Sequence, residues 1–208
     1  MPDRRFLGHL QIIAGYPIHF VCLRLKLAFG IPQKSVIADL VLLSCIGLRI
    51  VFVHGGGPEI NQWLNRLGIK PNFLNGLRVT DESTMEIVSM VLVGKVNKNL
   101  VGLINKAGAT AVGLCGTDGR IFTAIPSPNA AQLGFVGEIS NIDTSVLRPL
   151  INDNLIPVIA SVAADGTGQS YNINADMATE KLLLLTDVAG ILENKDDPES
   201  LVKEICEN

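Results

Sequence analysis

The chain has 208 residues, of which 48% are hydrophobic and 18% charged, and its formal net charge is −3. This composition excludes a disordered chain and disfavours electrostatic binding to nucleic acid. The four cysteines and three histidines are scattered without metal-ligand spacing, which favours reduced thiols over a metal centre. The longest apolar stretch, residues 10–23, is short and interrupted by Gln, Pro and His, so we expect no membrane span.

The first strong elements follow residue 33. Residues 33–45 carry apolar side chains at helical spacing and are followed by Gly47, a suitable C-cap. The all-apolar run at 50–53 is typical of a strand buried on both faces. After a glycine loop, Pro58 suits the first turn of another helix, which Gly68 closes.

The middle of the chain predicts one long helix and another buried strand. The helical stretch runs from 82 to about 106, and either Thr80 or Asp81 can cap its N-terminus. Residues 110–114 predict a buried strand.

The last third predicts mainly strands. Residues 119–125 and 135–139 are typical of a hairpin or a pair of edge strands. A capped helix over 143–154 leads into 156–163, the best candidate for a parallel strand, and 182–192 predicts the last strand. Apolar strands that alternate with helices indicate an α/β fold, namely a three-layer αβα sandwich with a mainly parallel open sheet.

The loop HGGGPE at 54–59 follows a predicted buried strand. At that position bare backbone N–H groups can hold a phosphate or an oxyanion, and three consecutive glycines favour this role over a plain turn. A dinucleotide fingerprint is disfavoured because Ile60 replaces its third glycine, and a P-loop because Val96 follows Lys95. An esterase would require a G-x-S-x-G nucleophile elbow, which the sequence lacks.

A series of motifs is similar to those of the N-acetylglutamate kinases, most of all the plant form. In chain order they are VHGGGPEIN, NGLRVTD, MEIVSMVLVGKVNKNLV, GFVGEI, IPVIASVAAD, YNINAD and LLLLTDVAGILENK. The resemblance implies the amino-acid kinase fold. It also implies transfer of the γ-phosphoryl group of ATP, with Mg²⁺, to the side-chain carboxylate of N-acetyl-L-glutamate in arginine biosynthesis.

The resemblance also implies roles for residues of the acetylglutamate side. Gly56 and Gly57 match glycines whose N–H groups hold the transferring phosphoryl group and the reacting acyl end. Arg78 matches the residue that pairs with the substrate α-carboxylate, for which a guanidinium is well suited. Asn172 and Asn174, two positions apart in an extended segment, offer the donor and acceptor that an N-acetyl amide needs.

On the nucleotide side, Asp176 matches an aspartate that orients two catalytic lysines. Thr186, Asp187 and Gly190 match the strand end that contacts the nucleotide. His54 precedes the glycine loop, and we interpret it as structural.

Three departures from the family pattern bear on activity. The K-x-G-G strand of the family is replaced by a stretch with only Lys26 and the lone Gly30. Residues 177–179 stand where the family has a full helix, and the sequence stops at Asn208, before the second catalytic lysine of the family. We therefore expect little or no kinase turnover from this chain alone.

These departures predict two regions and leave several hypotheses open. Residues 1–33 form an atypical segment, and 34–208 form a kinase domain that is incomplete at both termini, with a partial nucleotide-binding half from about 177. Besides an active kinase, the chain could be an incomplete homologue that binds N-acetylglutamate or joins intact subunits. A product that does not fold stably is a third hypothesis, and a dehydrogenase is a remote fourth.

Partners and compartment are expectations from the resemblance. Helix 85–101 is apolar around much of its circumference, which favours a homo-oligomer interface, as in the family. The family also suggests a PII-type regulatory protein as a partner and, through the plant form, a chloroplast location. The first 38 residues are basic but not Ser-rich, so they give no clear transit peptide.

Overall fold

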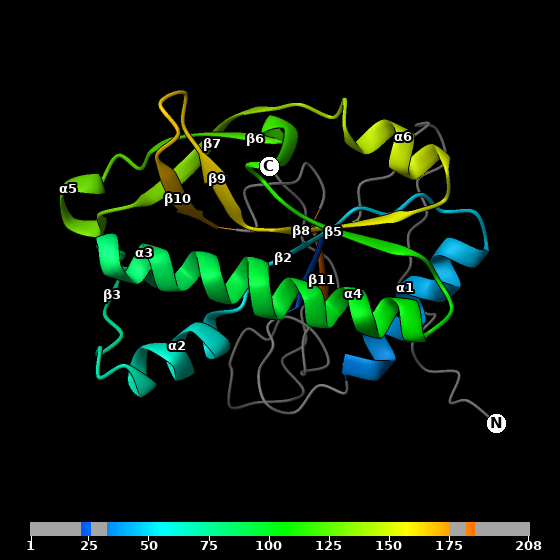
Figure 1. Ribbon diagram of the computed structural model, residues 1–208, viewed down its shortest axis with the longest axis horizontal. Helices are drawn as coiled ribbons and strands as arrows, with labels where there is room; N and C mark the ends of the chain where they lie inside the picture. Colours follow the sequence, from blue (N-terminus) through cyan, green and yellow to red (C-terminus); the bar gives the residue numbers. More distant parts are fainter. Residues whose placement is uncertain (1–21, 26–32, 175–181, 186–208) are drawn as a thin grey trace, which may run out of the picture.

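A computed structural model describes residues 22–25, 33–174 and 182–185 (Figure 1). The helices are α1 Gln33–Cys45, α2 Gly57–Arg66, α3 Glu82–Ser89, a π-helix Met90–Val96, α4 Asn97–Lys106, a 3₁₀ turn Asp118–Arg120, α5 Ala130–Leu133 and α6 Leu147–Asn152. The strands are β1 Cys22–Leu25, β2 Phe52–His54, β3 Phe73–Leu74, β4 Leu77–Arg78, β5 Ala111–Cys115, β6 Phe122–Pro126, β7 Val136–Ile142, β8 Ile156–Ala160, β9 Val162–Ala164, β10 Ser170–Ile173 and β11 Leu182–Leu185.

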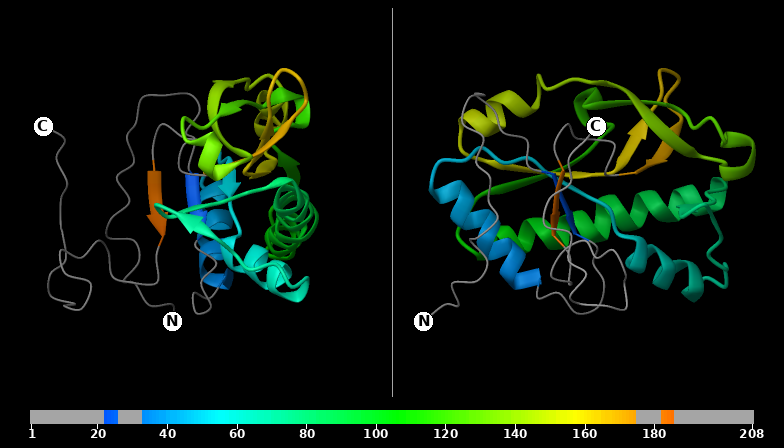
Figure 2. Two further views of the ribbon diagram at one scale, coloured as in Figure 1. Left: turned by 90° about the vertical axis from the view of Figure 1, so that its left-hand side faces the viewer. Right: turned by 180° about the vertical axis from the view of Figure 1, so that it is seen from behind.

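A parallel sheet in the order β2–β8–β5 forms the centre of the fold. All five residues of β8 are buried, which confirms the parallel strand predicted over 156–163. The predicted stretch forms two strands, because β8 ends at Ala160 and β9 begins at Val162. β1 and β11 pair in parallel as a separate ribbon, and β1 lies beside β2 (Figure 2). Of the last predicted strand, 182–192, only residues 182–185 lie within the described residues.

The two faces of the sheet bury alternate residues of the run 50–53. Ile50 and Phe52 belong to a core shared with α1, α2 and the long helix. Val51 and Val53 belong to a second core, shared with α6 and the strands β6, β7, β9 and β10. All four side chains of the run 50–53 are buried, which explains why this run is apolar throughout and does not alternate with polar residues. The predicted α/β architecture with helices on both faces of a parallel sheet is confirmed (Figure 1).

The second face also carries the strands β6, β7, β9 and β10, which pair in both directions and close into a barrel. β6 and β7 pair antiparallel, which confirms the predicted hairpin, and its connection contains the short helix α5. β10 joins β7 in parallel and β9 antiparallel, and a single pairing between Thr123 and Ala164 completes the ring.

The predicted helix from 82 to about 106 is continuous, but it contains a π-helical middle. Asp81, rather than Thr80, caps it, because its carboxylate accepts a hydrogen bond from the Thr84 N–H at 2.8 Å. The helix is long and apolar enough to cross a bilayer by length and composition. Its fully buried Leu100 and Ile104 belong to the first core, and we therefore assign it as the central core helix.

Glycines end the first two helices as predicted. Gly47 and Gly68 follow α1 and α2 with φ of +92° and +74°, in the left-handed region that favours glycine. Pro58 lies in the first turn of α2, also as predicted. α6 is shorter than predicted and begins at Leu147, and no side chain caps its N-terminus.

Candidate functional site

The glycine loop leaves the carboxyl end of β2 and leads directly into α2, with Gly56 at the N-cap position. A Cβ on Gly56 would lie 2.8 Å from Leu92 Cδ2 and 3.1 Å from Val96 Cγ2, so this glycine lets the loop approach the π-helix closely. Around Gly57 the nearest atom to such a Cβ is Arg78 Nη2 at 3.9 Å. The loop therefore combines tight packing at Gly56 with backbone that faces a cationic side chain at Gly57.

Arg78 carries a buried positive charge next to the loop. Its exposed fraction is 7%, and Nη2 donates to the Gly57 carbonyl at 3.2 Å. The guanidinium lies over the Phe73 ring at 4.8 Å from the centroid. Nη1 is buried without a hydrogen-bond partner, and no carboxylate in the described parts of the chain pairs with this arginine. Burial lowers the pKa of Arg78 from its ordinary value, yet arginine stays protonated in proteins.

Thr80 links Arg78 to Asn172, although 92 positions separate the hydroxyl and the amide in the sequence. The buried Thr80 hydroxyl donates to the Arg78 carbonyl at 2.9 Å and accepts from Asn172 Nδ2 at 3.3 Å. The Thr80 backbone is fixed in turn by hydrogen bonds with Leu133 and Phe135. The structure thus brings Gly57, Arg78 and Asn172 into one hydrogen-bonded chain.

Ser161 connects the glycine loop to the asparagine-bearing strand. Its N–H donates to the His54 carbonyl at 3.1 Å, and its carbonyl accepts from the Ile173 N–H at 3.0 Å. Asn174 follows β10 directly and is half-buried. Sequence reasoning missed Ser161 as part of the site, because a single polar residue in an apolar segment carries no spacing signal, and it considered Thr80 only as a helix cap.

His54 ends β2 and is fully buried. Its Nδ1 lies 3.0 Å from the Gly55 carbonyl oxygen, and its Nε2 lies 3.0 Å from Asn97 Nδ2. Burial lowers the pKa of His54 to about 4, so the ring is neutral at pH 7. The structural role predicted for His54 is consistent with these contacts, which join the glycine loop to the long helix.

Asp176, Thr186, Asp187 and Gly190 lie outside the described residues. Within residues 22–25, 33–174 and 182–185, no group of three or more His, Cys, Asp or Glu side chains is placed to hold a metal ion.

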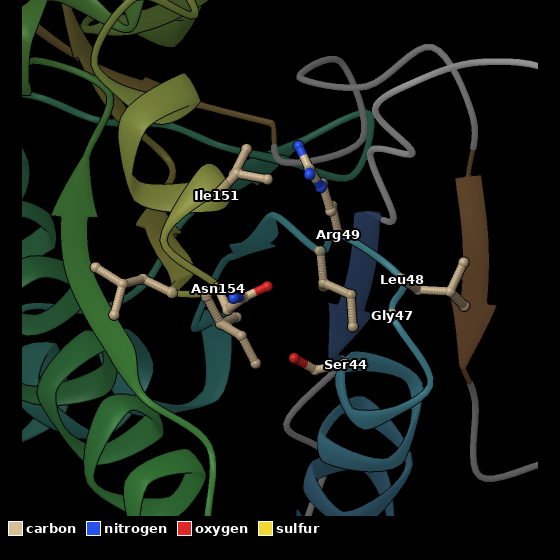
Figure 3. Close-up of a pocket in the computed structure, with 9 residues that line it drawn as sticks. Ser44, Gly47, Leu48, Arg49, Ile151 and Asn154 are labelled. Carbon is tan, nitrogen blue, oxygen red and sulfur yellow. The ribbon is translucent and has the colours of Figure 1, made fainter.

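A pocket lies at the opposite edge of the central sheet (Figure 3). Its lining includes Ile50, which precedes β2, and Ile156, which begins β8, whereas the glycine loop follows the end of β2. Arg49 at its rim donates to Asn152 Oδ1 at 2.7 Å. Because it lies at the amino ends of the strands, this pocket is separate from the candidate site.

The fold and site define a class: an α/β protein with a glycine loop and a buried arginine at the carboxyl edge of a parallel sheet. The model of the amino acid kinase family matches residues 29–208, and the chain belongs to that family.

Curated relatives are acetylglutamate kinases. The chloroplastic enzyme of Arabidopsis thaliana is 67% identical over 182 residues, which cover 83% of this chain and 52% of that protein. The enzyme of Nostoc punctiforme is 56% identical over 182 residues, covering 83% and 61%. The chain therefore spans between about half and two thirds of the length of these relatives.

Solved structures agree with the fold. A Streptococcus mutans protein superposes with a TM-score of 0.73 at 28% identity, covering 84% of this chain and 75% of its own. N-acetylglutamate synthase from Neisseria gonorrhoeae, solved with coenzyme A and N-acetyl-glutamate, superposes with a TM-score of 0.67 at 24% identity. That alignment covers 85% of this chain and 43% of the synthase, and at this identity it supports the fold alone.

Proposed function

We propose that the chain binds N-acetyl-L-glutamate as the acetylglutamate side of an acetylglutamate kinase. The observation that carries this proposal is the buried Arg78 guanidinium, whose Nη1 has no partner and which no described carboxylate neutralises. A buried cation without a counter-charge is costly, and an anionic ligand would remove that cost. The identities of 67% and 56% to the two acetylglutamate kinases cited above support the choice of ligand.

The ligand has three polar ends, and the site offers a group for each. Arg78 binds the α-carboxylate through a charge-assisted hydrogen bond. Asn172 and Asn174 bind the acetamido group, and Thr80 fixes the orientation of the Asn172 amide. The side-chain carboxylate lies at the glycine loop, where Gly56 and Gly57 supply N–H donors at the positive end of α2.

The reaction that follows is phosphoryl transfer. A side-chain carboxylate oxygen attacks the γ-phosphorus of ATP, the bond from that phosphorus to the bridging β–γ oxygen breaks, and ADP leaves; Mg²⁺, if bound, would offset the charge of the phosphates. The products are ADP and an acyl phosphate. Roles for Asp176 in orienting catalytic lysines, and for Thr186, Asp187 and Gly190 in nucleotide binding, rest on the family resemblance alone.

The first test is a calorimetric titration of the purified chain with N-acetyl-L-glutamate, beside Arg78→Lys and Arg78→Ala. Arg49→Ala is the matched control, because Arg49 is an exposed arginine at the other edge of the sheet. We expect saturable binding that Arg78→Ala weakens at least about tenfold, as loss of a charged hydrogen bond implies. Absence of binding in the wild-type chain, or equal effects of Arg78→Ala and Arg49→Ala, would refute the proposal.

A second candidate is a homologue that binds N-acetyl-L-glutamate without catalysis or joins intact subunits. The sequence favours it at one point: the K-x-G-G motif of the family has no counterpart in residues 16–33. Incubation with ATP, Mg²⁺ and hydroxylamine distinguishes the two candidates, because hydroxylamine converts an acyl phosphate to a hydroxamate. Binding with hydroxamate formation supports the kinase, and binding without it supports the second candidate.

Assembly, regulation and compartment are also proposals. On the helix predicted as an oligomer interface, Met90 has an exposed fraction of 63%, which leaves an apolar side chain available to a second copy. We expect Met90→Glu to reduce the molar mass measured by light scattering if that surface forms a homo-oligomer. Co-sedimentation with a PII-type protein tests the proposed regulation, and import into isolated chloroplasts tests the proposed compartment.

A further inference from the structure

The ring of His54 is held from both sides by groups of fixed polarity. A carbonyl oxygen only accepts, so the Nδ1 atom that lies 3.0 Å from the Gly55 oxygen must carry the hydrogen. Nε2 then has a lone pair and accepts a hydrogen bond from Asn97 Nδ2 at 3.0 Å. The contacts therefore select the neutral Nδ1–H tautomer.

Asn97 is fixed as well. Its Nδ2 group carries two hydrogens and lies near three acceptors, namely His54 Nε2 and the carbonyls of Val158 at 2.8 Å and Leu114 at 3.1 Å, so one hydrogen is shared between two of them. The two carbonyls determine how the amide is turned, because Oδ1 could not face them. Its Oδ1 accepts from Lys98 Nζ at 3.2 Å. Gly113 makes room for this group, since a Cβ there would overlap Asn97 Oδ1. Asn97 is fully buried, so it presents a rigid donor to His54.

The π-helix places two consecutive residues against the same loop. Val96 ends the π-helix and packs against Gly56, while Asn97 begins α4 and bonds to His54. π-helical turns inside α-helices often occur at functional sites. Here the turn lets the long helix support both the packing and the hydrogen bonding of the glycine loop.

The hydrogen bond to Gly55 determines where the Gly56 N–H points. The carbonyl of Gly55 and the N–H of Gly56 belong to one trans peptide and point in opposite directions. His54 holds that carbonyl toward the protein interior, so the Gly56 N–H faces away from the His54 ring. Among the described residues, no backbone carbonyl accepts a hydrogen bond from this N–H.

We propose that His54 and Asn97 are positioning residues that hold the Gly55–Gly56 peptide so that the Gly56 N–H faces the bound ligand. The inference rests on the proposed function, because the ligand is the reacting carboxylate of N-acetyl-L-glutamate and the phosphoryl group it receives. A donor fixed before binding need not reorganise when negative charge arrives, and such preorganisation is how backbone N–H groups stabilise anions. Neither His54 nor Asn97 touches the ligand.

The first measurement needs no variant. Nitrogen-15 spectra of the ligand-free chain at pH 7 report which ring nitrogen of His54 carries hydrogen. A neutral Nδ1–H ring supports the proposal, and an Nε2–H or charged ring overturns it. Because no ligand is present, this result stands apart from the proposed function.

The second measurement compares His54→Leu with His54→Gln, since the Gln amide can donate to Gly55 and accept from Asn97. We expect His54→Leu to move the Gly56 amide resonance and to weaken N-acetyl-L-glutamate binding about tenfold, with His54→Gln restoring most of both. Equal effects of the two variants, or an unmoved Gly56 resonance in a folded His54→Leu protein, overturn the proposal. If His54→Leu does not fold, Asn97→Leu takes its place, with the same expected shift of the Gly56 resonance. A wild-type chain that shows the Nδ1–H ring but no binding refutes the proposed function and the ligand assigned to the Gly56 N–H.

Discussion

Burial of His54 predicts a loss of stability in mild acid. The pKa of this histidine falls from 6.5 to about 4 because burial disfavours the charged ring, a decrease of about 2.5. Each pKa unit corresponds to about 1.36 kcal/mol, which gives about 3 kcal/mol for the whole decrease. In the unfolded chain His54 binds a proton below pH 6.5, whereas the folded chain does not until about pH 4. As the pH is lowered from about 6.5 to about 4, His54 therefore binds a proton in the unfolded chain but not in the folded chain. This stabilises the unfolded chain, so the free energy of unfolding falls over that range.

Urea denaturation at several pH values between 4.5 and 7 measures this effect, with His54→Gln as the reference protein. We expect the unfolding free energy of the wild-type chain, relative to that of His54→Gln, to fall by about 2–3 kcal/mol between pH 7 and pH 4.5. Burial raises the pKa of Asp39 and hydrogen bonds from Thr84 lower that of Asp81, but both carboxylates are common to the two proteins. A difference that stays constant over this range would show that His54 is not buried as a neutral ring.

Three substitutions, two of them with a matched control, test the packing and the helix cap that support the site, each by its denaturation midpoint. Gly56→Ala should cost about 1–3 kcal/mol of stability, because its Cβ would overpack against Leu92 and Val96. The control Gly94→Ala has no atom near its Cβ and should be neutral or stabilising by up to about 1 kcal/mol. Similar midpoints for the two variants would contradict the close approach of Gly56 to the π-helix. Gly134→Ala should cost more than either, because its Cβ would overlap the Thr80 carbonyl and its φ is +67°, and full stability of this variant would refute that geometry. Asp81→Ala should cost about 1 kcal/mol through loss of the helix cap, against less than about 0.5 kcal/mol for the exposed Ser83→Ala; equal costs would show that the cap contributes nothing.

The fold was predictable where local chemistry and burial agree. The glycines after α1 and α2 end those helices because the left-handed conformation suits glycine, and that signal is local. The run at 156–160 reads as a central parallel strand because all of its side chains are buried. The π-helix at 90–96 was not predictable, because the apolar pattern of this stretch does not distinguish a π-helix from an α-helix, whereas its contact with Gly56 appears only in the folded chain.

The candidate site was likewise predictable only where its signals are local in the sequence. Three glycines in a row predicted a loop of bare backbone, and Arg78 followed from its motif, because both signals are contiguous in the sequence. Thr80 and Ser161 were missed because their parts in the site arise only when strands from distant regions meet.

The glycine loop shows why one sequence signal can carry two physical requirements. A bare backbone is needed wherever N–H groups must reach an anion, and equally wherever a side chain would collide with a neighbouring element. Gly56 meets the second requirement through its contact with the π-helix, while Gly57 lies beside Arg78, which no carboxylate among the described residues neutralises. Substituting Gly56 would therefore disturb stability and anion binding together. His54 and Asn97 hold the Gly55–Gly56 peptide without occupying the space between Gly56 and the π-helix. Substituting them therefore separates anion binding from close packing better than substituting Gly56 does.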